Sequence, residues 1–172
     1  WARAIPDELV RVRPVLRVTY AWAMLNEGAL AAAEARLIEA EQWLETFADA
    51  SARPQAPAME MIVVDEAQFR TLPASLATAR AYLAQSRGDL PVAVKYGQRA
   101  LDFLPETDHL RRGPAAALLG LAQWASGDLE AAHRTLAAAM AGFQQVGNLH
   151  FATSVTSGLA DIRMVQGRLQ DA

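Results

Sequence analysis

The stretch Ser126-Gly127-Asp128-Leu129-Glu130-Ala131-Ala132 decides the fold, because it separates two apolar runs of helical period. Gly127 can take the left-handed backbone conformation that closes a helix at its C-terminus. Asp128 can then accept hydrogen bonds from the free N–H groups at the start of the next helix. The stretch therefore predicts a helix end, a tight turn and a helix start within about three residues.

Three other segments repeat this corner, and their spacing indicates internal repeats. They are Glu27-Gly28-Ala29-Leu30, Arg87-Gly88-Asp89-Leu90 and Gln166-Gly167-Arg168-Leu169. The anchor glycines Gly28, Gly88, Gly127 and Gly167 stand 60, 39 and 40 residues apart. The period is therefore about 40 residues, and the first interval holds about 20 residues more than one period.

Small residues stand at fixed distances from the anchor glycines. Seven residues before them are Ala21, Ala81, Gly120 and Ala160. Five residues after them are Ala33, Ala93, Ala132 and Ala172, and twelve residues after the first three are Ala40, Ala100 and Ala139. Such columns at helical spacing indicate close contact between helices, because a larger side chain would clash there.

These columns match the tetratricopeptide pattern, which places Leu-Gly in the first helix of each pair and Ala-x3-aromatic, then Pro, in the second. Leu119-Gly120 meets the first part, Ala132 with Leu136 meets the second with leucine for the aromatic residue, and Pro105 meets the last. The period exceeds the usual length of about 34 residues. Gly97 also stands where an aromatic residue is expected. HEAT-type repeats share the 40-residue period and are the alternative.

We predict an all-α fold, a tetratricopeptide-like right-handed superhelix of antiparallel helix pairs, as a single domain over residues 1–172. The expected repeats are 14–50, 73–105, 114–147 and a truncated 149–172, with an irregular insertion at 51–71. The expected helices are 6–13, 14–25, 30–49, 73–86, 90–104, 114–126, 129–146 and 149–166. Residues 169–172 would begin one more helix, so we expect a piece of a longer protein whose open last repeat allows self-association.

Composition excludes several classes of function. The chain has 172 residues, a net charge of −3 and no cysteine, which rules out disulfides, thiolate metal sites and cysteine nucleophiles. The near-neutral charge disfavours nucleic-acid contacts by this segment. No apolar run reaches the ~20 residues of a membrane span, and there is no signal-peptide pattern. The expected location is therefore cytoplasmic, with no membrane contact, cofactor or metal.

The sequence carries no enzyme motif, and we expect a binding protein. Ile62-Val63-Val64-Asp65-Glu66 looks like an ATPase strand, but no Gly-rich phosphate loop accompanies it. We interpret residues 59–64 as an apolar stretch that packs the insertion onto the helices. The histidines lack metal-ligand spacing and are interpreted as helix-end or surface residues; they are His109, His133 and His150. The cluster of Arg3, Arg11, Arg13 and Arg17 is interpreted as a solvated or inter-domain face.

The first helix of each pair is expected to line a ligand-binding groove, because ligands of such repeat stacks usually lie on the concave surface. The glycine register places the inward positions ten, six, three and two residues before each anchor glycine. The candidate ligand residues at these positions are Trp22, Asn26, Thr78, Tyr82, Gln85, Ser86, Trp124, Ser157 and Asp161. Aromatic platforms beside amides and hydroxyls suit a sugar, a nucleoside-like effector or a peptide. The alternative is that the aromatic residues belong to the core between repeats.

Several segments resemble the helical sensor region of MalT-type, LuxR-family ATP-dependent transcriptional activators. They are Ala4-Ile5-Pro6-Asp7-Glu8-Leu9-Val10, Arg13-Pro14, Ala21-Trp22-Ala23-Met24-Leu25, Ala81-Tyr82-Leu83-Ala84-Gln85-Ser86-Arg87-Gly88-Asp89 and the run from Gly120 to Ala132. The resemblance implies a bacterial sensor segment that receives a small-molecule effector, such as a sugar, or a protein partner. It also implies an ATPase module before this region and a DNA-binding module after it, neither of which lies in these residues. The alternative function is a peptide-binding tetratricopeptide scaffold without a small-molecule effector.

Overall fold

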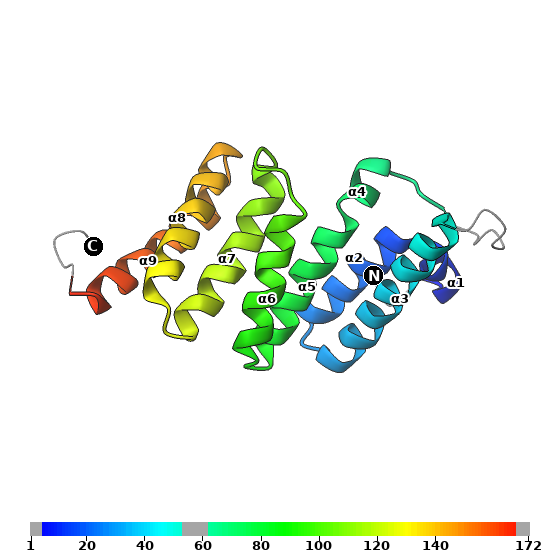
Figure 1. The fold of residues 1–172 in the computed structure, drawn as a ribbon, viewed down its shortest axis with the longest axis horizontal. Helices are drawn as coiled ribbons and strands as arrows, with labels where there is room; N and C mark the ends of the chain where they lie inside the picture. The colour runs from blue at the N-terminus through cyan, green and yellow to red at the C-terminus, as the bar shows by residue number, and fades with distance from the viewer. Residues whose placement is uncertain (1–4, 53–61, 168–172) are drawn as a thin grey trace. The chain divides into compact units, whose positions relative to one another are not determined.

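The computed structural model describes residues 5–52 and 62–167, and within these ranges it contains helices and no strands (Figure 1). The helices are α1 (Asp7–Arg11), α2 (Pro14–Asn26), α3 (Leu30–Ala52), α4 (Glu66–Arg70), α5 (Leu72–Ser86), α6 (Leu90–Asp102), α7 (His109–Ala125), α8 (Leu129–Gln145) and α9 (Leu149–Val165). The chain forms two compact units, residues 1–79 and 80–172, with the boundary inside α5. The all-α prediction is confirmed.

The corner at Gly127 and Asp128 has the expected geometry. Gly127 has a φ of 88°, and Gly28, Gly88 and Gly167 have φ values of 76°, 77° and 74°. The N–H of Asp128 donates to Gln123 O at 3.0 Å, which satisfies a carbonyl at the end of α7 as in a Schellman motif. The Asp128 carboxylate accepts from Ala131 N at 3.1 Å and caps α8. Gly127 thus ends α7, and the next residue, Asp128, starts α8.

The small-residue columns lie where helices touch. A methyl group added at Gly120 on α7 would lie 2.6 Å from Leu136 Cγ on α8, and one added at Gly113 would lie 2.9 Å from Phe143 Cε1. The earlier residue on α7, Gly113, faces the later residue on α8, Phe143, and Gly120 faces the earlier Leu136. The two helices therefore run antiparallel. The alanines of the columns are also buried in the described residues, apart from the half-buried Ala160; the buried ones are Ala21, Ala81, Ala33, Ala93, Ala132, Ala40, Ala100 and Ala139.

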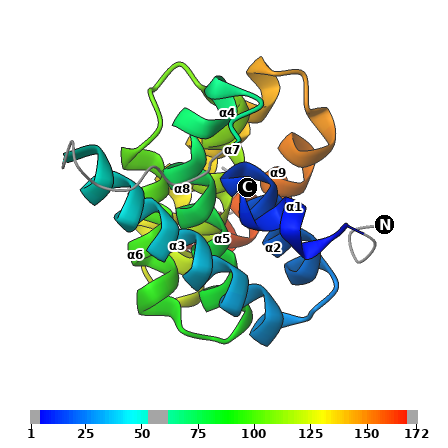
Figure 2. The ribbon, with the colours of Figure 1, turned by 90° about the vertical axis from the view of Figure 1, so that its right-hand side faces the viewer.

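Unit 1 is built on α2 and α3, which pack against each other across the turn between them (Figure 2). Its core includes Val18 and Leu25 of α2 and Leu37 of α3, each exposed by 2% or less. The expected irregular insertion contains a short helix, α4, capped by the Asp65 carboxylate, which accepts from Gln68 N at 3.0 Å. Residues 53–61 of the insertion lie outside the described residues.

Unit 2 stacks α6, α7, α8 and α9, each packed against the next along the chain. The start of α7 was predicted at residue 114 and this was wrong, because the helix begins at His109. The Asp108 carboxylate caps it by accepting from Arg111 N at 3.2 Å. Arg112 then donates to Leu101 O and Leu104 O, at 3.0 and 2.7 Å, and ties this first turn to the end of α6. The expected turn at 169–172 lies outside the described residues.

Candidate ligand-binding groove and cleft

The four predicted inward positions divide into two kinds in the structure. Ten and three residues before the anchor glycine, α2 places Val18 and Leu25, which are 2% exposed and belong to the core. Six and two residues before it, α2 places Trp22, which is half-buried, and Asn26, which is exposed. Only the second kind of position therefore faces outward on α2.

The same division holds on α7. Ala117 and Trp124, at ten and three residues before the glycine, both pack against buried clusters that include residues of α9. A methyl group added at Gly158 of α9 would lie 3.7 Å from Trp124 Cζ3. Leu121 and Ala125, at six and two residues, are exposed. Trp124 thus packs between repeats, which was the alternative to a groove position for the aromatic residues.

On α5 the packing positions are occupied by polar side chains. Gln85 stands at the position of Trp124, and its Oε1 is buried without a hydrogen-bond partner in the described residues. The Thr78 hydroxyl donates to Ala74 O at 2.8 Å. At the outward positions, Tyr82 is half-buried and Ser86 is exposed, and the Ser86 hydroxyl donates to Tyr82 O at 2.9 Å. The exposed Ser86 oxygen therefore keeps a lone pair that can accept a hydrogen bond.

On α9 both predicted groove residues are exposed, namely Ser157 and Asp161. Met164 and Val165, at the remaining inward positions of α9, are 49% and 68% exposed. At the predicted groove positions of unit 2, Tyr82 is therefore half-buried, and the exposed residues are Ser86, Leu121, Ala125, Ser157, Asp161, Met164 and Val165. Sequence reasoning missed this division, since it depends on which neighbour covers each side of a first helix.

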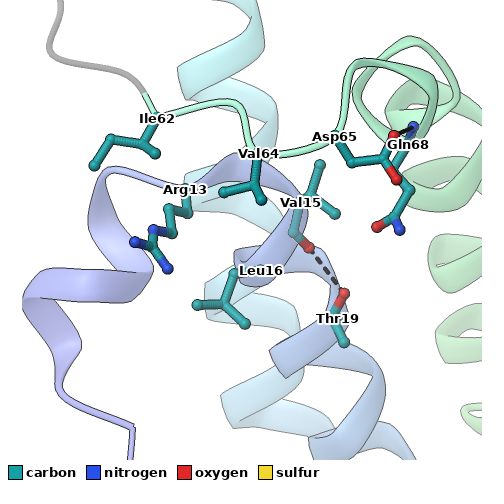
Figure 3. Close-up of a pocket in the computed structure, with 8 residues that line it drawn as sticks. All are labelled: Arg13, Val15, Leu16, Thr19, Ile62, Val64, Asp65 and Gln68. Atoms are coloured by element: carbon teal, nitrogen blue, oxygen red, sulfur yellow. Dashed lines mark hydrogen bonds between the residues drawn. The ribbon is translucent and has the colours of Figure 1, made fainter.

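A concave feature that the sequence did not predict lies in unit 1. It is a cleft of about 510 Å³ between α2 and the segment that leads into α4 (Figure 3). Its lining residues are Arg13, Val15, Leu16, Thr19, Ile62, Val64, Asp65 and Gln68. Val15 and Thr19 lie on the α2 face that also carries Trp22 and Asn26, because these positions follow helical spacing. The sequence offers only this helical spacing as a sign of the cleft, and the spacing does not reveal that residues 62–68 lie opposite α2.

A family model described as the MalT-like TPR (tetratricopeptide repeat) region matches residues 74–172, which include almost all of α5 and all of α6 to α9. The chain belongs to this family. Comparisons with curated protein sequences and with solved structures returned no significant match. A MalT-like TPR region is a helical sensor or scaffold segment of a regulator, and such regions are typically non-catalytic.

Other polar residues that the sequence pattern singled out lie at helix ends or between helices. Asp65, which ended the ATPase-like stretch, is the N-cap of α4. His133 Nε2 accepts from Arg163 Nε at 3.2 Å and links α8 to α9. His109 is the first residue of α7 and His150 is exposed near the start of α9. Within the described residues, no group of three or more metal-binding side chains occurs.

The interpretation of the basic cluster as a solvated face was wrong at Arg17. This arginine is 8% exposed and its Nη1 donates to Glu39 O on α3 at 3.3 Å. Arg13 is half-buried, and its Nε is buried without a partner in the described residues. Arg3 and the side chain of Arg11 lie outside the described residues.

The interpretation of residues 59–64 as an apolar stretch packed on the helices applies only in part, because Val64 is 79% exposed. No helix in residues 5–52 and 62–167 is long and apolar enough to span a membrane.

Proposed function

We propose that the chain is the effector- or partner-binding sensor segment of a bacterial transcriptional regulator. In this proposal it controls attached ATPase and DNA-binding modules, which lie outside these 172 residues. The observation that carries the proposal is the MalT-like TPR match over residues 74–172. The location is the cytoplasm, where a transcriptional regulator acts.

The exposed and half-buried residues at the predicted groove positions of unit 2 support a binding role. Tyr82 offers an aromatic ring, Ser86 and Ser157 offer hydroxyls, and Asp161 offers a carboxylate. A sugar presents apolar ring faces and hydroxyl groups to such a surface, so aromatic contact and hydrogen bonds combine in its recognition. The effector that fits this set is therefore a neutral, hydroxyl-rich small molecule.

The mechanism we propose is a shift of population between two arrangements of the helical stack. A ligand changes such an equilibrium only through its difference in affinity for the two states. A hundredfold preference corresponds to about 2.7 kcal/mol, which moves a state from 1% to about half of the population. The ligand-preferred state would release the ATPase and DNA-binding modules for assembly on the promoter.

The groove is tested by isothermal titration calorimetry with a maltooligosaccharide, a mononucleotide and a short peptide as separate probes. Tyr82→Ala should weaken binding of the active probe about tenfold, since it removes the aromatic platform. Tyr96→Ala is the matched control, because Tyr96 is also half-buried but lies on the second helix of its pair. Equal losses in both variants, with unchanged circular dichroism, would refute the groove assignment.

The family-level part of the proposal has its own test in the gene around this segment. We expect a Gly-rich phosphate loop encoded upstream and a helix-turn-helix encoded downstream. Their absence from the full reading frame would refute the regulator assignment and leave the binding groove as a separate question.

The second candidate function is a peptide-binding scaffold without a small-molecule effector. The observation in its favour is an uncharged face along α7 with exposed apolar residues; these are Leu110, Pro114, Leu121 and Ala125. An apolar stripe at helical spacing suits the face of an amphipathic partner helix. Binding of amphipathic peptides with no response to sugars or nucleotides in the same titrations would favour this scaffold.

A further inference from the structure

A hydrogen bond and a ring contact hold the walls of the cleft in unit 1 in place. Ile62 N donates to Val12 O at 3.0 Å and fixes the incoming segment beside the start of α2. The ring of Phe69 on α4 packs edge-on against Trp43 of α3, with centroids 6.4 Å apart. The volume of about 510 Å³ lies within the range of small-molecule sites, roughly 300–1,000 Å³.

The middle of the cleft is apolar. Val15 and Leu16 form its α2 side, and Ile62 and Val64 form the opposite side (Figure 3). Ile62 and Val64 are 41% and 79% exposed, so a ligand with an apolar body would remove their side chains from water. Burial of this surface is the general driving force for binding here.

Arg13 supplies a positive charge at one end of the cleft. Its buried Nε has no hydrogen-bond partner among the described residues. A buried guanidinium N–H without an acceptor is costly. A carboxylate is the group that best fits it, since the two form parallel charge-assisted hydrogen bonds.

The opposite end of the cleft offers acceptors. Asp65 and Gln68 lie there with Thr19, away from Arg13 (Figure 3). The Thr19 hydroxyl donates to Val15 O at 2.9 Å, which leaves its oxygen to accept. The Asp65 carboxylate uses Oδ1 to cap α4 and keeps Oδ2 as a further acceptor. This end therefore favours a ligand group that donates hydrogen bonds, such as an ammonium or a hydroxyl.

We propose that this cleft binds a small apolar carboxylate that carries a hydrogen-bond donor at its other end. The carboxylate pairs with Arg13, the apolar body covers Val15 and Val64, and the donor meets Asp65. The proposal uses the geometry of unit 1 alone and does not rest on the regulator function. It adds a ligand class that differs from the neutral, hydroxyl-rich effector of unit 2.

The test is calorimetric titration of the 172-residue chain with 6-aminohexanoate, hexanoate and hexylamine as probes. We expect 6-aminohexanoate to bind best, hexanoate next and hexylamine least. Arg13→Met should weaken binding of both carboxylates at least about tenfold, because it removes a charge-assisted pair. Arg134→Met is the matched control, since Arg134 is exposed on α8 in unit 2, and it should leave the titrations unchanged.

Two further variants keep the proposal testable if Arg13→Met does not fold. Asp65→Asn retains a helix cap and should reduce the preference for 6-aminohexanoate over hexanoate to about equality. Val64→Asp changes an exposed side chain and should abolish carboxylate binding by charge repulsion. Equal binding of hexanoate and hexylamine, or unchanged carboxylate affinity in Val64→Asp, would overturn the proposal. Titration with a maltooligosaccharide in the same variants reports on the groove independently.

Discussion

At the scale of single residues, Gly120 lets α7 and α8 approach so closely that one added methyl group would lie 2.6 Å from Leu136 Cγ and 2.7 Å from Leu136 Cδ2. We predict that Gly120→Ala lowers the free energy of unfolding by up to about 2 kcal/mol. Overpacking costs roughly 1–3 kcal/mol, and the better helix propensity of alanine offsets up to about 1 kcal/mol of it. Urea unfolding followed by circular dichroism measures the change.

Gly158 provides the matched control for this prediction, because it is also inside a helix but has space. A methyl group there would lie 3.7 Å from Trp124 Cζ3 and 3.8 Å from Leu136 Cδ1, which are ordinary contact distances. Gly158→Ala should therefore stabilise the protein by up to about 1 kcal/mol through helix propensity. If Gly120→Ala were as stabilising as Gly158→Ala, the close approach of α7 and α8 would be wrong.

Residues such as Gly127 and Asp128 were predictable from sequence because their requirements are local. A positive φ excludes most side chains, and an N-cap needs a short acceptor. The cleft was not predictable, since Arg13 meets residues 62–68 only after the insertion has returned the chain to α2. Trp124 lies between these cases, because its helical position was predictable but the sequence left open whether it lines the groove or packs between repeats.

At the scale of elements, α7 depends on a cap that the sequence argument overlooked. The predicted helix begins at Pro114, and proline favours the first turn of a helix, yet five helical residues precede it in the structure. Asp108 bonds Arg111 twice, with Oδ1 accepting from the backbone N at 3.2 Å and Oδ2 pairing with Nη1 at 3.0 Å. The sequence therefore holds a cap residue, Asp108, just before the helix start that the structure shows.

We predict that Asp108→Ala lowers the free energy of unfolding by roughly 1 kcal/mol, the usual cost of a lost N-cap. Asp108→Asn should recover most of the loss, because asparagine caps well without the charge. Thermal unfolding of the three proteins measures the order of stability. A loss in Asp108→Asn equal to that in Asp108→Ala would instead assign the effect to the ion pair with Arg111.

At the scale of the whole molecule, each unit is held by the burial of its helices on one another, and this burial is uneven. In unit 2, α7 packs on both α6 and α8, and α8 packs on both α7 and α9. Ala115, Ala122 and Ala132 are fully buried at these contacts. In unit 1, α4 buries none of its residues. Local opening requires less free energy where fewer apolar contacts are broken.

We therefore predict that hydrogen exchange is slowest in the middle of α7 and α8 and fastest in α4. In α9 only Ala152, Leu159 and Ile162 are buried, so its amides should exchange at least about tenfold faster than those of α8, which corresponds to ~1.4 kcal/mol. Exchange measured by mass spectrometry or NMR on the native chain gives this ranking. Equal protection of α4, α8 and α9 would mean that the chain opens only as a whole, and stability by contact with neighbouring helices would then be the wrong account of this fold.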